Sequence, residues 1–160
     1  MYRRFAFFVA FLTLAAPMHA MAQEAAQFGD WRAYCAPVAG CVLGVKSGEG
    51  DALAFVEPLS GESEALLVLK NPVADGARIA VSFDGVSTVI LGPDTGWSRV
   101  DSAVGPAIRI ASPIVEADLL EPMRRRNFMG ISYAVNDGPQ RRVTFSLNGY
   151  ADTRSYTDAE

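Results

Sequence analysis

Histidine is almost absent from this chain, and its scarcity excludes several kinds of catalysis. The only one, His19, lies in the first 22 residues, which we expect to be removed during export. Without it the Ser-His-Asp and Cys-His arrangements have no base, and zinc sites that use histidine or clustered cysteines are excluded as well. Walker-type phosphate loops, dinucleotide fingerprints and G-x-S-x-G elbows are also missing. We therefore expect no enzymatic activity, no metal and no cofactor.

Long hydrophobic runs are missing too. The longest, Phe5 to Ala16, is interrupted only by Thr13, and it is shorter than the roughly 20 apolar residues that cross a bilayer. Two arginines precede it, and Ala20-Met21-Ala22 follows with the small residues of a signal-peptide cleavage site. We place the cut after Ala22, although a cut after Ala20 fits nearly as well and an uncleaved anchor is the alternative. Residues 1–22 are thus a predicted signal peptide, and we expect no integral membrane span after cleavage.

The predicted mature chain, residues 23–160, has the size of one domain and an acidic balance. Cleavage leaves 138 of the 160 residues, which suits a single hydrophobic core. It removes Arg3 and Arg4 but no acid, so the formal net charge changes from −4 to −6. An acidic surface argues against polyanion partners, and we therefore expect no nucleic-acid partner.

Cysteine is scarce, with only Cys35 and Cys41 present. In an exported chain such a pair is typical of a disulfide, because the compartment is oxidising. The residues between them, Ala36-Pro37-Val38-Ala39-Gly40, contain the proline and glycine of a tight turn. The pair therefore predicts a disulfide that joins the two strands of a hairpin, with a structural role.

From Phe28 onward apolar residues recur mostly with period two, and turn signals come about every ten residues. This spacing is typical of an antiparallel β-sandwich. One predicted hairpin runs from Ile79 to Leu91 around Asp84-Gly85, and a second runs from Ile131 to Leu147 around Asn136–Pro139. Three more evenly apolar runs read as strands that could be buried on both faces: Cys41 to Lys46, Leu53 to Glu57 and Ala65 to Lys70. Gln23 to Gln27 shows no pattern.

One segment departs from the strand pattern. Between Ile114 and Phe128 the apolar residues have helical spacing, after a Ser112-Pro113 start that resembles a helix N-terminus. Pro122 falls late in this segment and is expected to kink or shorten it. The fold class we expect is therefore mainly β, an antiparallel β-sandwich with one short helix.

Candidate functional residues are few. Glu116, Asp118 and Glu121 sit together on the helix candidate and could serve glycoside cleavage, which needs two facing carboxylates, but acids near a helix start ordinarily face solvent. Arg124-Arg125-Arg126 is a possible partner or anion contact, and the structural alternative is that these cations complement the helix C-terminus and pair with the helix acids. Trp97, near a Gly-Pro-Asp-Thr-Gly loop, either anchors a partner or lies in the core. Trp31 is expected in the core beside the disulfide.

The start of the mature chain resembles the invasion-associated locus B family of exported bacterial proteins. The likeness lies in Phe28-Gly29-Asp30-Trp31-Arg32-Ala33-Tyr34-Cys35, followed by Cys41-Val42-Leu43. It continues more loosely through other segments: Ala77 to Gly85, Ala117 to Leu120, and Val143 to Tyr150, which we expect to be a closing strand with an L-x-G-aromatic end. Members often carry a second cysteine pair in the later half, and Gly96 to Ala107 has none.

The resemblance implies a compact β-sandwich in the periplasm or at the cell surface, associated with host-cell invasion in some relatives and without assigned catalytic residues. We therefore expect a non-enzymatic envelope protein that binds another protein of the envelope or of a host surface. The alternative is a small carbohydrate-active or ligand-binding sandwich that uses loop carboxylates. A cleft with two facing carboxylates would favour that alternative.

Overall fold

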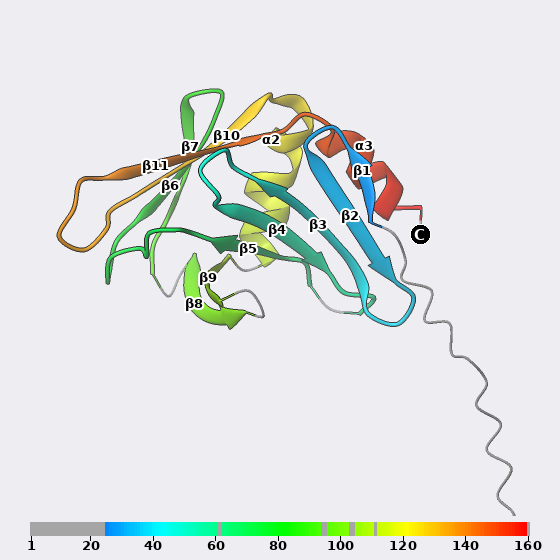
Figure 1. The fold of residues 1–160 in the computed structure, drawn as a ribbon, viewed down its shortest axis with the longest axis horizontal. Helices are drawn as coiled ribbons and strands as arrows, with labels where there is room; N and C mark the ends of the chain where they lie inside the picture. Colours follow the sequence, from blue (N-terminus) through cyan, green and yellow to red (C-terminus); the bar gives the residue numbers. More distant parts are fainter. Residues whose placement is uncertain (1–24, 61, 94–95, 103–104, 111, 160) are drawn as a thin grey trace, which may run out of the picture.

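The computed structural model describes residues 25–60, 62–93, 96–102, 105–110 and 112–159, so the predicted signal peptide lies outside the described residues. Two antiparallel sheets make up most of the described chain (Figure 1). This confirms the prediction of a mainly β sandwich. The larger sheet has the order β1-β2-β3-β4-β5-β9-β8. Its strands are β1 (Ala26–Phe28), β2 (Trp31–Ala36), β3 (Gly40–Lys46), β4 (Ala52–Glu57), β5 (Glu64–Val68), β8 (Trp97–Ser102) and β9 (Gly105–Ile110). The smaller has the order β11-β10-β6-β7, with β6 (Ile79–Phe83), β7 (Val86–Leu91), β10 (Phe128–Tyr133) and β11 (Arg141–Ser146).

Both predicted hairpins are present in the smaller sheet. Strands β6 and β7 pair around Asp84 and Gly85, which both have positive φ, and β10 pairs with β11. The alternation seen in the sequence decides which side chains are buried: Ile79, Val81 and Phe83 face the core because successive residues of a strand point to opposite faces.

The evenly apolar strands β3, β4 and β5 are not buried on both faces, which corrects one expectation. Leu43, Leu53 and Leu67 are fully buried on the inner face, whereas outward residues such as Val42 and Leu66 are exposed or half-buried. The outer face of β3, β4 and β5 is therefore largely apolar, and no other layer of the described chain covers it.

Three strands were not anticipated. Ala26–Phe28, in the segment without a pattern, forms β1 by pairing with β2, and β8 pairs with β9 along six residue pairs, from Trp97 with Ile110 to Ser102 with Gly105. Short edge strands such as β1 have little periodicity of their own, and their position depends on the strand beside them.

The predicted kinked helix runs from Ser112 to Arg125. It consists of α1 (Ser112–Ile114), a π-helical stretch η1 (Val115–Leu119) and α2 (Leu120–Arg125). At the junction Leu120 N–H donates to the Val115 carbonyl, an i to i−5 bond, so the wide turn precedes Pro122 and accounts for the irregularity. Val115, Leu119 and Met123 are buried in the core, and the segment lies behind β3 and β4 in Figure 1.

A second helix, α3 (Tyr150–Thr157), follows β11 where the sequence suggested the end of a strand. It packs against β1 and β2, and Figure 1 shows it beside these strands. Arg154 on α3 forms ion pairs with Glu57 of β4 and with Asp158. Burial raises the pKa of Tyr150, its first residue. The last strand therefore ends at Ser146, and the chain turns back over the larger sheet.

The predicted disulfide is present between directly opposed residues of β2 and β3, with the Cα atoms of Cys35 and Cys41 4.0 Å apart. Replacing both cysteines with serine should lower the free energy of unfolding by about 2 kcal/mol, since closing so short a loop restricts the unfolded chain only modestly. Thermal melts of the mature protein, oxidised, reduced and double-substituted, would measure the loss. Complete unfolding of the double variant at 25 °C would contradict this modest role.

Candidate functional site

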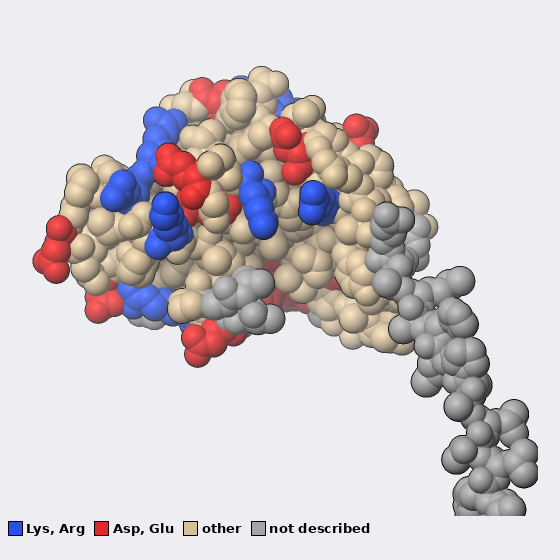
Figure 2. All heavy atoms as spheres, in the orientation of Figure 1, with Lys and Arg blue, Asp and Glu red and all other residues tan. Residues whose placement is uncertain are grey.

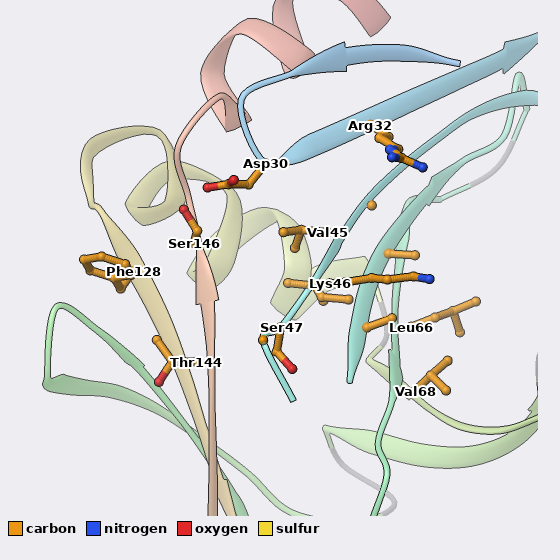
Figure 3. Close-up of a pocket in the computed structure, with 15 residues that line it drawn as sticks. Asp30, Arg32, Val45, Lys46, Ser47, Leu66, Val68, Phe128, Thr144 and Ser146 are labelled. Carbon is orange, nitrogen blue, oxygen red and sulfur yellow. The ribbon is translucent and has the colours of Figure 1, made fainter. Parts of the chain in front are cut away.

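A groove of about 700 Å³ opens where the outer face of the larger sheet meets the smaller sheet (Figure 3). We define the groove by its outward-facing floor residues and by the side chains of the opposite wall. The floor is made of Gly44, Ala52, Ala54, Leu66 and Val68, with Arg32 and Lys46 beside it, and the wall carries Phe128, Thr144 and Ser146, with Asp30 and Ser47 at its ends. The groove is thus a long, open site bordered by both sheets.

The strand register arranges the floor in two rows across the sheet. In one row Arg32 is paired with Gly44, which is followed by Ala54 and Leu66. In the other, Lys46 is paired with Ala52, which is followed by Val68. Each row begins with a cation and continues over small or aliphatic side chains. Because cross-strand neighbours are the side chains in contact on a sheet face, neither cation has an acid opposite it.

The cations of the groove have no ion-pair partner among the described residues. Neither Arg32 nor Lys46 belongs to any of their ion pairs, which join other side chains. Figure 2 shows lysine and arginine side chains on this side of the molecule, some over the larger sheet and others over the smaller sheet. With Asp30 as the acid of its lining, the groove has a net positive charge on a chain whose formal charge is −4. It is suited to an anionic ligand with apolar parts.

The acids proposed for glycoside cleavage do not meet across this groove. Glu116 accepts a hydrogen bond from Ser112 Oγ, at 3.4 Å, and Glu121 pairs with Arg125 on the helix. Neither lines the groove, so the two facing carboxylates that a glycosidase needs are not assembled there.

Two loop acids have structural roles instead. Asp51 is 2% exposed, and its carboxylate accepts hydrogen bonds from the Lys70 N–H, at 2.7 Å, and from Ser47 Oγ, at 3.2 Å. Asp84 accepts the N–H groups of Asn127 and Phe128, at 3.1 and 3.0 Å. Both carboxylates therefore hold connections between strands.

Trp97 is not the exposed anchor that the sequence left open. It is 6% exposed, and its Nε1 donates to the Ala77 carbonyl at 3.2 Å. Its ring centroid also lies 5.8 Å from the guanidinium of Arg99. That guanidinium donates a hydrogen bond to the Val73 carbonyl and forms an ion pair with Asp75. Trp97 belongs to the core because it is the first residue of β8 and points inward opposite Ile110.

The three arginines after the helix are used in part by neighbouring acids. Arg125 pairs with Glu121, as the structural alternative expected, and Arg124 lies 3.7 Å from Asp158 at the end of α3. Arg126 is exposed and follows the helix as its C-terminal cap. None of the three lines the groove, so the structure does not bring them together with Arg32 and Lys46.

Sequence reasoning missed the groove. It assigned no functional role to Arg32 or Lys46. A signal was present, because both cations occupy outward positions of strands whose other outward positions are apolar or glycine. Recognising it would have required the register, which sets these strands side by side.

A second hollow of about 560 Å³ lies at the other end of the larger sheet. Residues of β5, β8 and β9 line it together with the segment from Leu69 to Val73. Its charged members include Arg99, whose guanidinium is already bonded to Val73 and Asp75. Among the described residues there is no cluster of three potential metal ligands, and none of their helices is long and apolar enough to cross a membrane.

The residues that carry the family resemblance contact one another. Trp31 Nε1 donates to the Ser146 carbonyl at 2.9 Å, and Asp30 N–H donates to the Asn148 carbonyl at 3.1 Å. The Phe28–Trp31 opening thus packs against the Leu147–Tyr150 segment. These contacts join the start of the larger sheet to the end of the smaller one, beside the groove.

The sequence matches no family model and no curated protein. Among solved structures, the crystal structure of invasion associated protein B from Bartonella henselae is similar to this chain with a TM-score of 0.66. The two sequences are 12% identical over 85% of this chain and 96% of the other. At this identity the likeness shows a shared fold.

Proposed function

We propose that this chain is an exported, non-enzymatic protein of the bacterial envelope, related to the invasion-associated locus B proteins, that binds another protein through the groove. The single observation that carries the binding role is the groove itself, with two cations beside an uncovered apolar floor. A contiguous exposed apolar surface rimmed by polar groups is typical of interaction sites. The shared fold and the disulfide support the relationship and a location in the periplasm or at the cell surface.

The carbohydrate-active alternative gains no support from the groove. Asp30 is the acid in its lining, whereas glycoside cleavage needs a second carboxylate across the cleft. The non-enzymatic proposal would be contradicted if purified mature protein turned over a substrate and lost that activity when one carboxylate was replaced.

Ala54→Arg should abolish partner capture by filling the groove floor with a charged side chain. The tagged mature protein would be incubated with envelope extract, and retained proteins would be identified by mass spectrometry. Val56→Arg is the matched control: it lies on the same outward face of β4 and is also half-buried, but it does not line the groove.

A protein retained by the wild type and by Val56→Arg, but lost from Ala54→Arg, is the expected result. Equal retention by both variants would place the binding face elsewhere. Retention of glycan or small molecules without protein would contradict the protein-binding role and favour the ligand-binding alternative. Thermal melts of both variants would confirm that they are folded.

A further inference from the structure

The wall of the groove is an edge strand. Strand β11 is the first strand of the smaller sheet and pairs with β10 alone among the described strands. Edge strands present unpaired N–H and C=O groups that can accept a further strand. The question is which backbone groups of β11 point toward the groove.

The hydrogen bonds at the end of β11 settle this direction. Leu147 N–H donates to the Asn127 carbonyl at 2.8 Å, on the β10 side. The Ser146 carbonyl accepts the Trp31 indole, on the opposite side. Since backbone groups of successive strand residues alternate in direction, Thr144 and Arg142 direct their N–H and C=O groups the same way as Ser146, away from β10.

These backbone groups are open. Thr144 and Arg142 are exposed, and no hydrogen bond found between described residues outside the regular strand pairing uses their backbone. Thr144 also lines the groove. The edge is closed at Ser146, where Trp31 takes the carbonyl, and it opens toward Arg142 as β11 leaves the larger sheet. The groove therefore has a strand edge on one side and an apolar floor with two cations on the other.

We infer that the groove binds an extended acidic segment of a partner protein, which adds to β11 as a further strand of the smaller sheet. This inference rests on the proposed function and specifies its mode. Main-chain hydrogen bonds to Thr144 and Arg142 hold the segment, as in other cases of β-strand addition. Every second side chain of the added strand faces the floor.

The charges specify which side chains fit. Apolar side chains of the segment pack on Ala54, Leu66 and Val68, and acidic ones meet Arg32 and Lys46. The Arg142 side chain lies over the outer face of β10, where its Nε would be 3.5 Å from a Cβ placed on Gly130, so it is directed away from the open edge. The occupant therefore carries both acidic and apolar residues among the positions, two residues apart, whose side chains face the floor.

The inference is tested with a displayed library of random peptides of about a dozen residues, selected on the folded mature protein. Enriched peptides should carry both acids and apolar residues at positions two residues apart, because these side chains share one face of a strand. Thr144→Pro should weaken binding of the selected synthetic peptide at least about tenfold, because proline removes the N–H to which the added strand would bond. The sheet tolerates proline there, since at an edge strand the N–H does not serve its own ladder.

Two comparisons separate edge pairing from other effects. Thr144→Val keeps the N–H and should bind within about twofold of the wild type, whereas Lys46→Glu should weaken binding about tenfold at low salt. Peptides N-methylated at alternate amides extend the test without altering the protein. Methylation in one register should abolish binding and methylation in the other should not, which keeps the inference falsifiable even where Thr144→Pro unfolds the chain.

An absence of enriched peptides, or enriched peptides indifferent both to Thr144→Pro and to the register of methylation, would overturn the added strand. Oleate is an anion with a long apolar tail, so it is the small-molecule alternative for this groove. Binding of oleate without binding of any peptide would also overturn the added strand. A partner captured from envelope extract that is lost from Ala54→Arg but retained by Thr144→Pro would leave the proposed function standing and refute this mode. Capture of no protein at all would instead contradict the proposed function.

Discussion

Trp31→Ala should lower the free energy of unfolding by about 3–5 kcal/mol, the usual cost of removing a buried tryptophan. The side chain has no exposed surface. Its ring centroid lies 4.9 Å from that of Tyr150 and 6.1 Å from that of Phe55, so it packs with aromatic side chains of α3 and β4. The indole Nε1 also donates to the Ser146 carbonyl at 2.9 Å, which joins the two sheets.

Trp31→Phe separates the packing from the hydrogen bond. Phenylalanine retains much of the buried ring but leaves the Ser146 carbonyl without its donor, at a cost of about 1–3 kcal/mol. Urea denaturation of both variants of the mature protein would measure the two losses. If Trp31→Ala cost less than Trp31→Phe, or less than about 1 kcal/mol, the ring would not be the core element that its burial indicates.

The parts of the fold that could be predicted from the sequence are those with a local cause. Alternation from Ile79 to Phe83 with Asp84-Gly85 predicts a hairpin because side-chain direction and turn geometry are properties of a short segment. The Cys35 and Cys41 pairing has the same origin, since the turn between them brings the two strands together.

The parts that could not be predicted depend on contacts between distant segments. Trp97 follows a loop by composition, and its burial depends on pairing with β9 and on the Ala77 carbonyl. Helix α3 has too little hydrophobic periodicity to be recognised, because its buried residues Tyr150, Thr153 and Thr157 include two threonines. The groove depends on a register across four strands, from Arg32 to Leu66, which single-strand patterns do not contain.

The location of the resemblance explains why it indicates a fold rather than a ligand. Phe28–Trp31 and Leu147–Tyr150 are the segments that hold the two sheets and α3 together. Their side chains and turns serve packing in any sandwich of this arrangement. Of the opening motif only Asp30 and Arg32 reach the groove, so the proposed binding surface is formed mainly by residues outside the motif.

Gly149→Ala should cost about 3 kcal/mol or more, for two separate reasons. Gly149 has φ +87°, a conformation that costs an L-residue roughly 1–2 kcal/mol. A Cβ there would also lie 1.9 Å from the Phe28 carbonyl oxygen and 2.4 Å from its carbon. These are backbone atoms of the β1–β2 turn, which is held in place by the Asp30 to Asn148 hydrogen bond. Relief of the clash requires moving that turn away from the start of α3, with the cost of overpacking, typically 1–3 kcal/mol.

Gly50→Ala supplies the matched control, because Gly50 has a similar φ of +96° and a Cβ added there would meet no heavy atom within 4 Å. It should show the conformational cost alone, about 1–2 kcal/mol. Urea denaturation would give both values, and their difference measures the close approach of Asn148-Gly149 to Phe28-Gly29. Equal losses would mean that the turn yields freely to a Cβ at Gly149. A larger loss at Gly149 would show that the two ends of the fold are held against each other at this point, which also fixes the closed end of the β11 edge beside the groove.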